Sequence, residues 1–475
     1  MDQLLQDPQG QHVVLFTHNE QSHITPLFNL ARLLASRGLQ VTCALPATAY
    51  ASYISNNNNN NNNPSTGPDA NLQVESVEES PQHSSDDLLL LQKKLEEGLL
   101  CLLGRLQPPP LFLIADVMYF TWSQEVANRL GLSLFLFAPF FATTLLVACH
   151  LPQLLQRGLL PFQTGTEEEV IDFIPGLMEG FRIADIPLEF LGRNSAELEA
   201  FNFLDYCKAC TGLVLCNTSL AFHEVEAEAM DALMALGVRI YPIFPMLHMD
   251  WCNNSSLQLY REDDRCLSWL DGQPRGSVVY ASFGSIIPLT REEIQELALG
   301  LEACGQPFLW VIRRVEGVSD VMSVLPPGFV DRVNNKLGLI VSWAPQMAVL
   351  SHPSVGCFLF HSGFASLIEA IWAGVPMIGG FYKISDQNTV FRVMTEGWRV
   401  ALPLIDKSPP QSLLRNSIET AIKEVLHGER DGGTAASIRQ RIAQLRAALK
   451  EAAAPNGSSR RYLDHFVDAL QLSPS

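Results

Sequence analysis

The chain has 475 residues, of which 47% are hydrophobic and 17% are charged. That balance suits a globular protein with sizeable buried cores, and the length predicts two or three domains. The chain carries 32 Lys and Arg against 50 Asp and Glu, a net charge of −18. An acidic chain of this kind argues against binding to nucleic acid or to anionic lipid.

The first part of the chain alternates between short apolar runs and amphipathic stretches. Residues 12–17 predict a strand, residues 26–38 a helix that begins at Pro26, and residues 40–45 the next strand. The same alternation continues, with strands expected at 111–115, 134–137 and 213–216 and helices at 88–103, 121–130 and 222–236. This order of strands and helices predicts a parallel sheet covered by helices.

Two segments of the first part have an unusual composition. Residues 56–68 contain eight consecutive asparagines followed by a stretch rich in proline, which we interpret as a tolerated surface loop. Residues 134–149 are almost wholly apolar, but they are short for a membrane span and Pro139 interrupts them. We therefore expect a buried strand followed by a buried helix. With no leader pattern at the start and no anchor at the end, we expect a cytoplasmic protein without a membrane anchor.

The alternation restarts in the second part of the chain. Strands are expected at 277–283, 308–312, 338–341, 355–360 and 375–379, and helices at 291–303 and 364–373. We predict two successive β/α domains, residues 1–245 and 263–457, joined by a linker at 246–262, with 458–475 as a C-terminal helix that packs back on the first domain. Ligands of such sheets bind at the carboxyl ends of the strands.

Several familiar catalytic motifs are absent from the sequence. There is no G-x-G-x-x-G, G-x-x-x-x-G-K-[ST], G-x-S-x-G or H-E-x-x-H, which argues against dinucleotide oxidoreductases, P-loop NTPases, common serine hydrolases and zincins. Cys207, Cys210, Cys216 and His223 lack the second well-spaced pair of a zinc site. We expect no metal and no cofactor.

One anion site is suggested by residues 361–366, which follow a predicted strand and open a predicted helix. The first N–H groups of a helix have no intrahelical acceptor and attract anions, and Gly363 would allow a ligand to approach the backbone closely. His361 adds a ring N–H and Ser366 a hydroxyl. On these residues alone, an N-capped core helix is the simpler interpretation.

The surrounding residues resemble a known family. Over 45 residues the chain shows, in order, Trp343-Ala-Pro-Gln346, His352-Pro-Ser-Val-Gly356, His361-Ser-Gly-Phe-Ala-Ser366, Glu369, Gly374-Val-Pro-Met377 and Asp386-Gln387. This order resembles the signature box of plant secondary-product UDP-glycosyltransferases, which reads W-A-P-Q, H-x-x-V-G, H-C-G-W-N-S, E, G-V-P-M and D/E-Q. The resemblance implies a GT-B architecture, in which two Rossmann-like α/β domains face a central cleft. It also implies transfer of glucose or a similar hexose from a UDP-sugar to a small lipophilic acceptor, such as a flavonoid, another phenolic or a terpenoid, giving a β-glycoside.

The resemblance assigns donor-binding roles in the second domain. Trp343 would stack on uracil, the backbone near Ala344 would read the edge of the base, and Gln346 and Glu369 would bind the ribose hydroxyls. The phosphates would lie at Ser285, His361, Gly363, Phe364, Ala365 and Ser366, with the helix N–H groups and His361 supplying positive potential. Asp386 and Gln387 would bind the sugar, and Gln387 is typical of a glucose donor.

The resemblance places the catalytic pair in the first domain. His23, in Ser22-His-Ile-Thr-Pro26, resembles the family's G-H-x-x-P loop, and a neutral imidazole can accept the proton of an acceptor hydroxyl. Asp116, at the end of the strand 111–115, would fix the tautomer of that imidazole and stabilise its charged form. His12 and His18 are competitors for the role of base. Phe137, Phe140 and Phe141 are expected to line the acceptor pocket, and we expect a monomer.

The chain also departs from the family pattern. Ser362, Phe364 and Ala365 stand where Cys, Trp and Asn are usual, and the loss of the amide at 365 could cost ~1–3 kcal/mol of donor binding. The loop before Asp386 is one residue longer than usual. These changes indicate a divergent member of the family. They leave two alternatives open, a degenerate non-catalytic binder of a UDP-sugar or metabolite and a C-glycosyltransferase.

Overall fold

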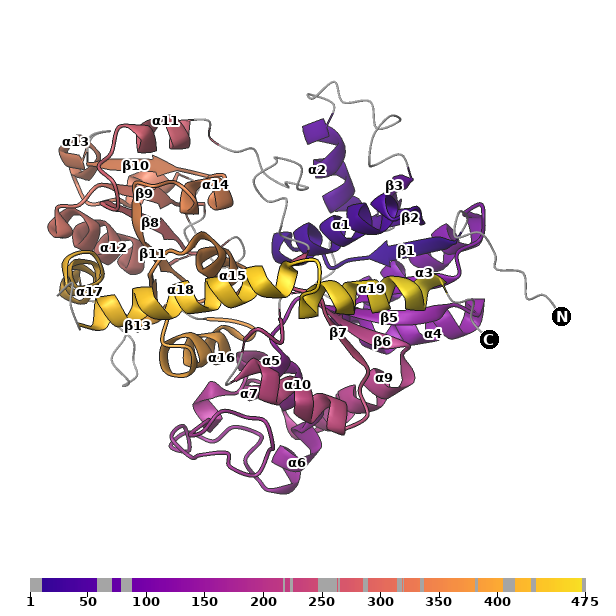
Figure 1. The fold of residues 1–475 in the computed structure, drawn as a ribbon. Helices are drawn as coiled ribbons and strands as arrows, with labels where there is room; N and C mark the ends of the chain where they lie inside the picture. Colours follow the sequence, from indigo (N-terminus) through magenta and orange to yellow (C-terminus); the bar gives the residue numbers. More distant parts are fainter. Residues whose placement is uncertain are drawn as a thin grey trace.

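The computed structural model describes residues 11–57, 71–77, 88–216, 218–222, 225–246, 263, 265–284, 289–313, 318, 320–333, 337–380, 383–404, 415–428 and 433–471. They form two lobes, each a parallel sheet with helices packed on both faces (Figure 1). Most of the asparagine-rich loop, residues 247–262 of the expected linker, His223 and Ser285 lie outside the described residues.

The first lobe is built on a seven-stranded sheet. Its strand order is β3-β2-β1-β4-β5-β6-β7, and every neighbouring pair is parallel. The strands are β1 (His12–Phe16), β2 (Gln40–Pro46), β3 (Leu72–Val77), β4 (Phe112–Asp116), β5 (Ser133–Ala138), β6 (Gly212–Leu215) and β7 (Ile240–Pro242). The order turns back between β1 and β4, so the loops that follow these two strands open a crevice where a ligand can bind.

Helices cover both faces of this sheet. They are α1 (Gln21–Ser36), α2 (Ala47–Asn57), α3 (Leu88–Arg105), α4 (Phe120–Leu130), α5 (Ala142–Cys149), α6 (Leu151–Gln156), α7 (Leu188–Leu191), α8 (Ser195–Ala200), α9 (Phe203–Ala209) and α10 (Glu226–Ala235). The interpretation of residues 134–149 as a buried strand and a buried helix is correct, since every residue of α5 is buried. Among the described residues, no helix is long and apolar enough to cross a membrane.

Two predicted helix starts in the first lobe are wrong. Helix α10 begins at Glu226 and not at residue 222, and the start of α1 is displaced further. Helix α1 begins at Gln21 and not at Pro26, so Pro26 lies inside the helix and His23 in its first turn. The backbone N–H groups of His23 and Ile24 donate to the Glu20 carbonyl at 3.0 and 2.8 Å, which starts the helix one turn earlier. The preference of proline for the first turn placed the predicted start too late.

The second lobe repeats the design with six parallel strands, in the order β10-β9-β8-β11-β12-β13. They are β8 (Val278–Ser282), β9 (Phe308–Val311), β10 (Gly338–Val341), β11 (Val355–Phe360), β12 (Met377–Gly379) and β13 (Ala401–Pro403). Around them lie α11 (Arg265–Asp271), α12 (Arg291–Cys304), α13 (Phe329–Val333), α14 (Gln346–Leu350), α15 (Phe364–Ala373), α16 (Gln387–Arg392), α17 (Arg415–His427) and α18 (Thr434–Ala453). The strands at 338–341 and 355–360 and the helix at 364–373 match their predicted bounds.

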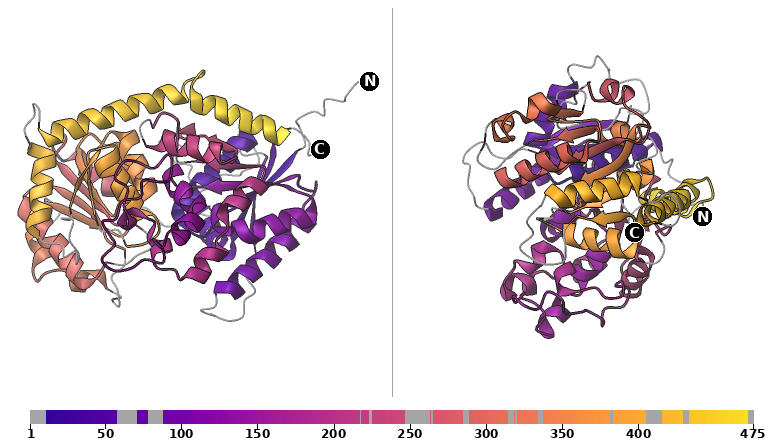
Figure 2. Two further views of the ribbon diagram at one scale, coloured as in Figure 1. Left: turned by 90° about the horizontal axis from the view of Figure 1, so that it is seen from below. Right: turned by 90° about the vertical axis from the view of Figure 1, so that its left-hand side faces the viewer.

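The last two helices cross from one lobe to the other. Helix α18 packs on the second lobe, and α19 (Ser458–Gln471) continues over the first, so that the two run nearly end to end (Figure 2). The ring of Phe466 on α19 lies 5.2 Å from Phe135 and 5.4 Å from Tyr241, measured between ring centroids. Helix α19 is therefore part of the core of the first lobe.

The lobes also meet in an aromatic contact beside the cleft. Phe141, just before α5, is fully buried and meets Phe364 of the second lobe edge to face, with ring centroids 4.1 Å apart. Trp398 contacts Phe141 at 5.1 Å and Phe222 at 4.5 Å. Edge-to-face pairs of this kind stabilise beyond the burial of their area, so this contact fixes how the lobes face each other.

Phe466→Ala should lower the free energy of unfolding by about 3–5 kcal/mol, because it leaves a cavity between α19 and the first sheet. Urea denaturation followed by tryptophan fluorescence measures the change. Asp468→Ala, an exposed position on the same helix, serves as the control. Equal effects of the two substitutions would show that α19 does not belong to the core of the first lobe.

Candidate active site

The structure brings His23 and Asp116 into direct contact. His23 lies in the first turn of α1 after β1, and Asp116 is the last residue of β4, the neighbouring strand. Their Nδ1 and Oδ2 atoms are 2.8 Å apart, and both side chains are buried. The carboxylate therefore holds the proton on Nδ1, which leaves Nε2 as the nitrogen able to accept a proton.

The groups around Asp116 favour the ionised form of its carboxyl group. The backbone N–H groups of Met118 and His18 donate to Asp116 at 3.0 and 3.3 Å. Burial alone would raise the pKa of Asp116, but the charge and hydrogen bond of His23 outweigh it and the pKa is lowered. Burial is the largest effect on His23 and acts to lower its pKa, but the charge and hydrogen bond of Asp116 and the charges of Glu20 and Asp386 together outweigh it, so that this pKa is raised above its ordinary value.

The two competing histidines lie in different environments. His12, at the start of β1, makes hydrogen bonds through Nδ1 to the Pro108 carbonyl and through Nε2 to the Thr42 hydroxyl, at 2.7 and 2.8 Å. His18 is 5.4 Å from His23 between ring centroids, and it meets Asp116 through its backbone N–H and not through its ring. Burial, and then the charge of His23, lower the pKa of His18.

A group of polar side chains from the second lobe forms one network. Gln346 Nε2 donates to Ser366 Oγ at 2.9 Å and to Glu369 Oε2 at 2.5 Å, and Tyr280 donates to Gln346 Oε1 at 3.1 Å. Burial raises the pKa of Glu369 to about 7, although the hydrogen bond from Gln346 opposes that rise. An amide beside a carboxyl group can hold a pair of adjacent hydroxyls, such as those of a ribose.

His361, directly after β11, is enclosed by two glycines. A Cβ atom added at Gly284 would come within 2.7 Å of its Nε2 atom, and one at Gly363 would come closer still. Burial lowers the pKa of His361 to about 4, against a weaker opposing effect of the Ser282 backbone. The ring is therefore neutral at pH 7. His361 can therefore offer a ring N–H to a ligand.

The start of α15 keeps its shape despite the unusual residues there. Gly363 is the N-cap, and Ser362 before it has a φ of 59°. The backbone N–H groups of residues 364–366 belong to the first turn, where a helix has no intrahelical acceptors for them. Phe364 is buried against Phe141, so the exchange of Trp for Phe is absorbed by the contact between the lobes. Ala365 offers no side-chain donor.

Asp386 faces the first lobe from the N-cap of α16. Its Oδ2 atom accepts a hydrogen bond from Thr144 of α5 at 3.1 Å, and burial raises its pKa to about 6. Its charge also acts to raise the pKa of His23, so the two side chains lie near each other. Gln387 turns its Oε1 atom back to the Lys383 N–H at 2.8 Å, which closes the longer loop before Asp386.

Trp343 lies after β10, and Arg313 follows β9. The guanidinium carbon of Arg313 is 4.9 Å from the centroid of the Trp343 ring. A guanidinium over an indole face is attracted by the quadrupole of the ring. Arg313 therefore brings positive charge to the position where uracil is expected to stack, and Ala344 beside it is buried.

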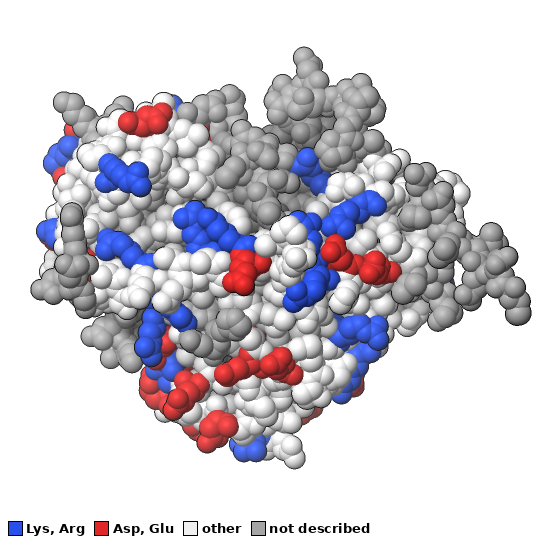
Figure 3. All heavy atoms as spheres, in the orientation of Figure 1, with Lys and Arg blue, Asp and Glu red and all other residues white. Residues whose placement is uncertain are grey.

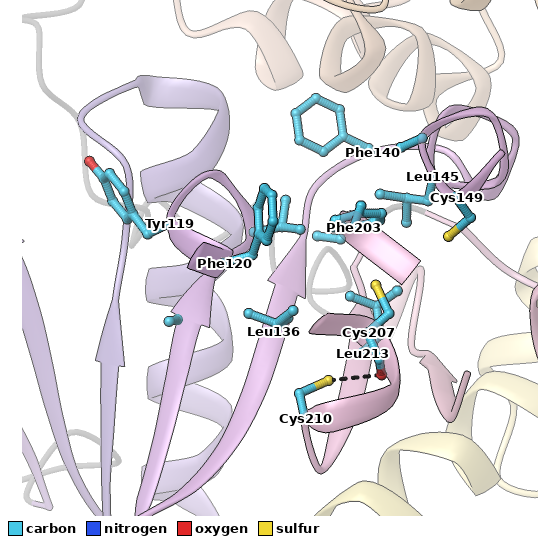
Figure 4. Close-up of a cluster of buried hydrophobic side chains, with 14 of the residues drawn as sticks. Tyr119, Phe120, Leu136, Phe140, Leu145, Cys149, Phe203, Cys207, Cys210 and Leu213 are labelled. Carbon is cyan, nitrogen blue, oxygen red and sulfur yellow. Dashed lines mark hydrogen bonds between the residues drawn. The ribbon is translucent and has the colours of Figure 1, made fainter. Parts of the chain in front are cut away.

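The three phenylalanines expected to line the acceptor pocket lie in different environments. Phe137 and Phe141 have no exposed surface, and each is packed in a core. Phe140 lies just beyond the end of β5 (Figure 4), and its ring meets that of His23 at 5.6 Å, edge to face. Only Phe140 therefore remains as a candidate wall for a pocket beside His23.

Three cysteines of the first lobe lie in one apolar cluster. Cys149, Cys207 and Cys210 are buried among Phe120, Phe203 and Leu145, and Cys210 donates to the Cys207 carbonyl (Figure 4). Within the described ranges, no group of three or more His, Cys, Asp or Glu side chains could hold a metal ion.

Comparison with known proteins agrees with this geometry. The family described as UDP-glucuronosyl and UDP-glucosyl transferase matches residues 241–432. The chain is 30% identical over 495 aligned residues to 7-deoxyloganetin glucosyltransferase of Catharanthus roseus, covering 98% of this chain and 97% of that protein. It is also 30% identical to mogroside I-E synthase of Siraitia grosvenorii, covering 97% and 98%.

The chain belongs to the plant UDP-glycosyltransferase family. Phytolacca americana UGT2, solved with UDP-2-fluoro-glucose and pterostilbene, superposes with a TM-score of 0.80 at 27% identity, covering 97% of this chain and 99% of that one. The two parallel sheets therefore form a GT-B fold, and the protein is a UDP-glycosyltransferase of the hexosyltransferase type.

Several groups of this glycosyltransferase's cleft were not found from the sequence. Thr144 donates to Asp386 from an almost wholly apolar stretch, and no local pattern marks it. Glu189 on α7 interacts with Asp386 and His23, and burial raises its pKa to about 7. The Leu188 N–H donates to the Ser385 carbonyl at 2.8 Å, which brings α7 to this site. Only the Asp185-Ile-Pro187 motif before α7 could have pointed to the region.

Asp116→Asn should lower the pKa of His23, because burial would continue to act while the opposing charge is gone. NMR titration of the imidazole C–H signals measures this directly. His12 is an internal control, since its partners are Pro108 and Thr42. A His23 titration unchanged from the wild-type would contradict the pairing.

Proposed function

We propose that this glycosyltransferase moves glucose, or a similar hexose, from a UDP-sugar to a hydroxyl of a small lipophilic plant metabolite. Flavonoids, other phenolics and terpenoids are the acceptor classes that we expect. The observation that carries the proposal is the 2.8 Å contact between His23 and Asp116 in a cleft that Asp386 faces from the other lobe. In this arrangement residues 1–245 bind the acceptor and residues 263–457 bind the donor.

The proposed reaction is a direct displacement at the anomeric carbon. Nε2 of His23 takes the proton of the acceptor hydroxyl, whose oxygen forms a bond to the anomeric carbon as the bond to the UDP oxygen breaks. Asp116 stabilises the imidazolium that results. Attack opposite the leaving group inverts the configuration, so an α-linked UDP-sugar gives a β-glycoside without a covalent enzyme intermediate.

The donor would be held mainly by neutral hydrogen-bond donors. The free N–H groups at the start of α15, the Ser366 hydroxyl and the neutral ring of His361 would face the diphosphate. Gln346 and Glu369 would take the ribose, and Trp343 and Ala344 the base. Ser285 would also bind the phosphates. Asp386, Gln387 and Thr144 would surround the sugar.

The acceptor class is supported by the site and by the relatives. The edge of Phe140 at His23 offers an apolar surface next to the base, which suits a lipophilic molecule. Phytolacca americana UGT2 was solved with pterostilbene, and two relatives are named for 7-deoxyloganetin and a mogroside. These molecules differ in shape, which is why we propose the class and no single acceptor.

A non-catalytic UDP-sugar binder is the second candidate, and Ala365 is the observation that favours it. The chain lacks an amide at a position where the family uses one, and it carries a net charge of −18, which does not favour a dianionic group. Basic side chains are scattered over the face seen in Figure 3, whereas acidic ones gather around α7 and α10. The paired His23 and Asp116 favour catalysis, because a binder has no use for them.

Incubation with UDP-glucose and a panel of phenolic and terpenoid acceptors should release UDP and form glycoside. His23→Ala should reduce turnover by about 10²–10⁴-fold, the usual contribution of a general base, with the affinity for UDP unchanged by calorimetry. His18→Ala is the matched control and should retain most of the activity. Turnover that survives in His23→Ala would contradict His23 as the base, and tight UDP binding without wild-type turnover would favour the non-catalytic candidate.

A further inference from the structure

Glu20 lies on the open side of His23. It is the N-cap residue of α1, but its side chain does not cap the helix. Its Oε2 atom is 3.9 Å from Nε2 of His23, and its Oε1 atom is 3.8 Å from Nδ1 of His18. The side chain of Glu20 is 30% exposed, whereas that of His23 is 7% exposed, so the solvent reaches the carboxylate of Glu20 more readily than the imidazole.

The atom that Glu20 approaches is the one that matters for the proposed reaction. Nδ1 of His23 is occupied by Asp116, so Nε2 must receive the acceptor's proton. When that proton arrives, a positive charge develops on a ring with little access to water. A carboxylate about 4 Å away stabilises such a charge, and at 3.9 Å it leaves room for an acceptor oxygen at the edge of the ring.

We infer that Glu20 is a positioning residue of the proposed transfer, a second carboxylate that stabilises the charged form of His23 from the side of the acceptor. The inference rests on the proposed function, because it takes His23 as the base. The imidazole then lies between two carboxylates, with Asp116 at Nδ1 and Glu20 near Nε2. The local helix fixes this spacing, since His23 donates its backbone N–H to the Glu20 carbonyl at 3.0 Å.

Four other titratable groups face His23 from the elements packed around it. Asp116 comes from β4, His18 from the turn after β1, Asp386 from the N-cap of α16 and Glu189 from α7. Asp386 accepts a hydrogen bond from Thr144. Burial raises the pKa of Asp386 to about 6 and that of Glu189 to about 7. Both are therefore partly protonated near neutral pH, which weakens their effect on the ring. The carboxylate of Glu20 lies 3.9 Å from Nε2, so its charge acts directly on that atom.

This geometry sets the direction in which loss of the Glu20 charge should change the pH dependence of activity. His23 must be neutral to act as a base, so activity rises with pH through its pKa. The charge of Glu20 acts to raise that pKa. Removing the charge of Glu20 should move the acid limb of the pH profile to lower pH. It should also lower the rate on the plateau, because the imidazolium form of His23 loses a partner.

Glu20→Gln tests the inference through the pH dependence of kcat/KM with UDP-glucose and an acceptor that the wild-type uses. On the acid limb, activity relative to the plateau should be about three- to fivefold higher than in the wild-type, the size of effect that a charge ~4 Å away has in a watery environment. The plateau kcat should fall several-fold, and KM for UDP-glucose should stay unchanged. Glu20→Asp, which keeps the charge, should restore most of the wild-type profile.

Glu125→Gln is the matched control, since it removes the same charge from α4, where Glu125 is 62% exposed and paired with Arg129. The inference is overturned if Glu20→Gln follows the control in both the acid limb and kcat. It is also overturned if Glu20→Asp shifts the limb as far as Glu20→Gln, because the effect would then come from shape and not from charge. Turnover that survives in His23→Ala would instead contradict the proposed function, which separates the two failures.

Discussion

The site depends on one buried hydrogen bond, between Nδ1 of His23 and Oδ2 of Asp116. The two residues are 93 positions apart in sequence, and they meet because β1 and β4 are parallel neighbours that end at the same edge of the sheet. Burial alone would disfavour charge on both groups. Pairing reverses this for each of them, which is how a carboxylate with no exposed surface can remain ionised at neutral pH.

The second requirement of the proposed function is that the two lobes keep a fixed relation, because the proposed base lies in one lobe and the proposed donor-site residues lie in the other. Several contacts maintain it. Phe141 and Phe364 pack ring to ring, Asn388 on α16 donates to the carbonyls of Ala184 and Ile186, and α19 continues from α18 onto the first lobe. Phe364, which stands where the family has Trp, is part of this contact between the lobes.

Much of the fold could be predicted from the sequence, because most strands are short, wholly apolar runs with clear ends. β3 was missed because it lies at the sheet edge and is mostly only partly buried. Gln346, Ser366 and Glu369, which the family signature assigns to the donor site, form one hydrogen-bond network. Thr144, Glu189 and Glu20 could not be found in this way, since each gains its place from tertiary packing or from one turn of helix and not from a motif.

The chain carries a net charge of −18, so a dianionic UDP group needs a local source of positive potential. His361 is neutral at pH 7, so in the proposed function the positive potential at the diphosphate would come from the N–H groups at the start of α15, while Arg313 lies over the ring of Trp343. The most direct test of the whole account is the anomeric configuration of the product, read from its proton NMR spectrum early in the reaction with UDP-glucose. A single displacement from the side of His23 gives a β-glycoside. An α-glycoside would contradict it.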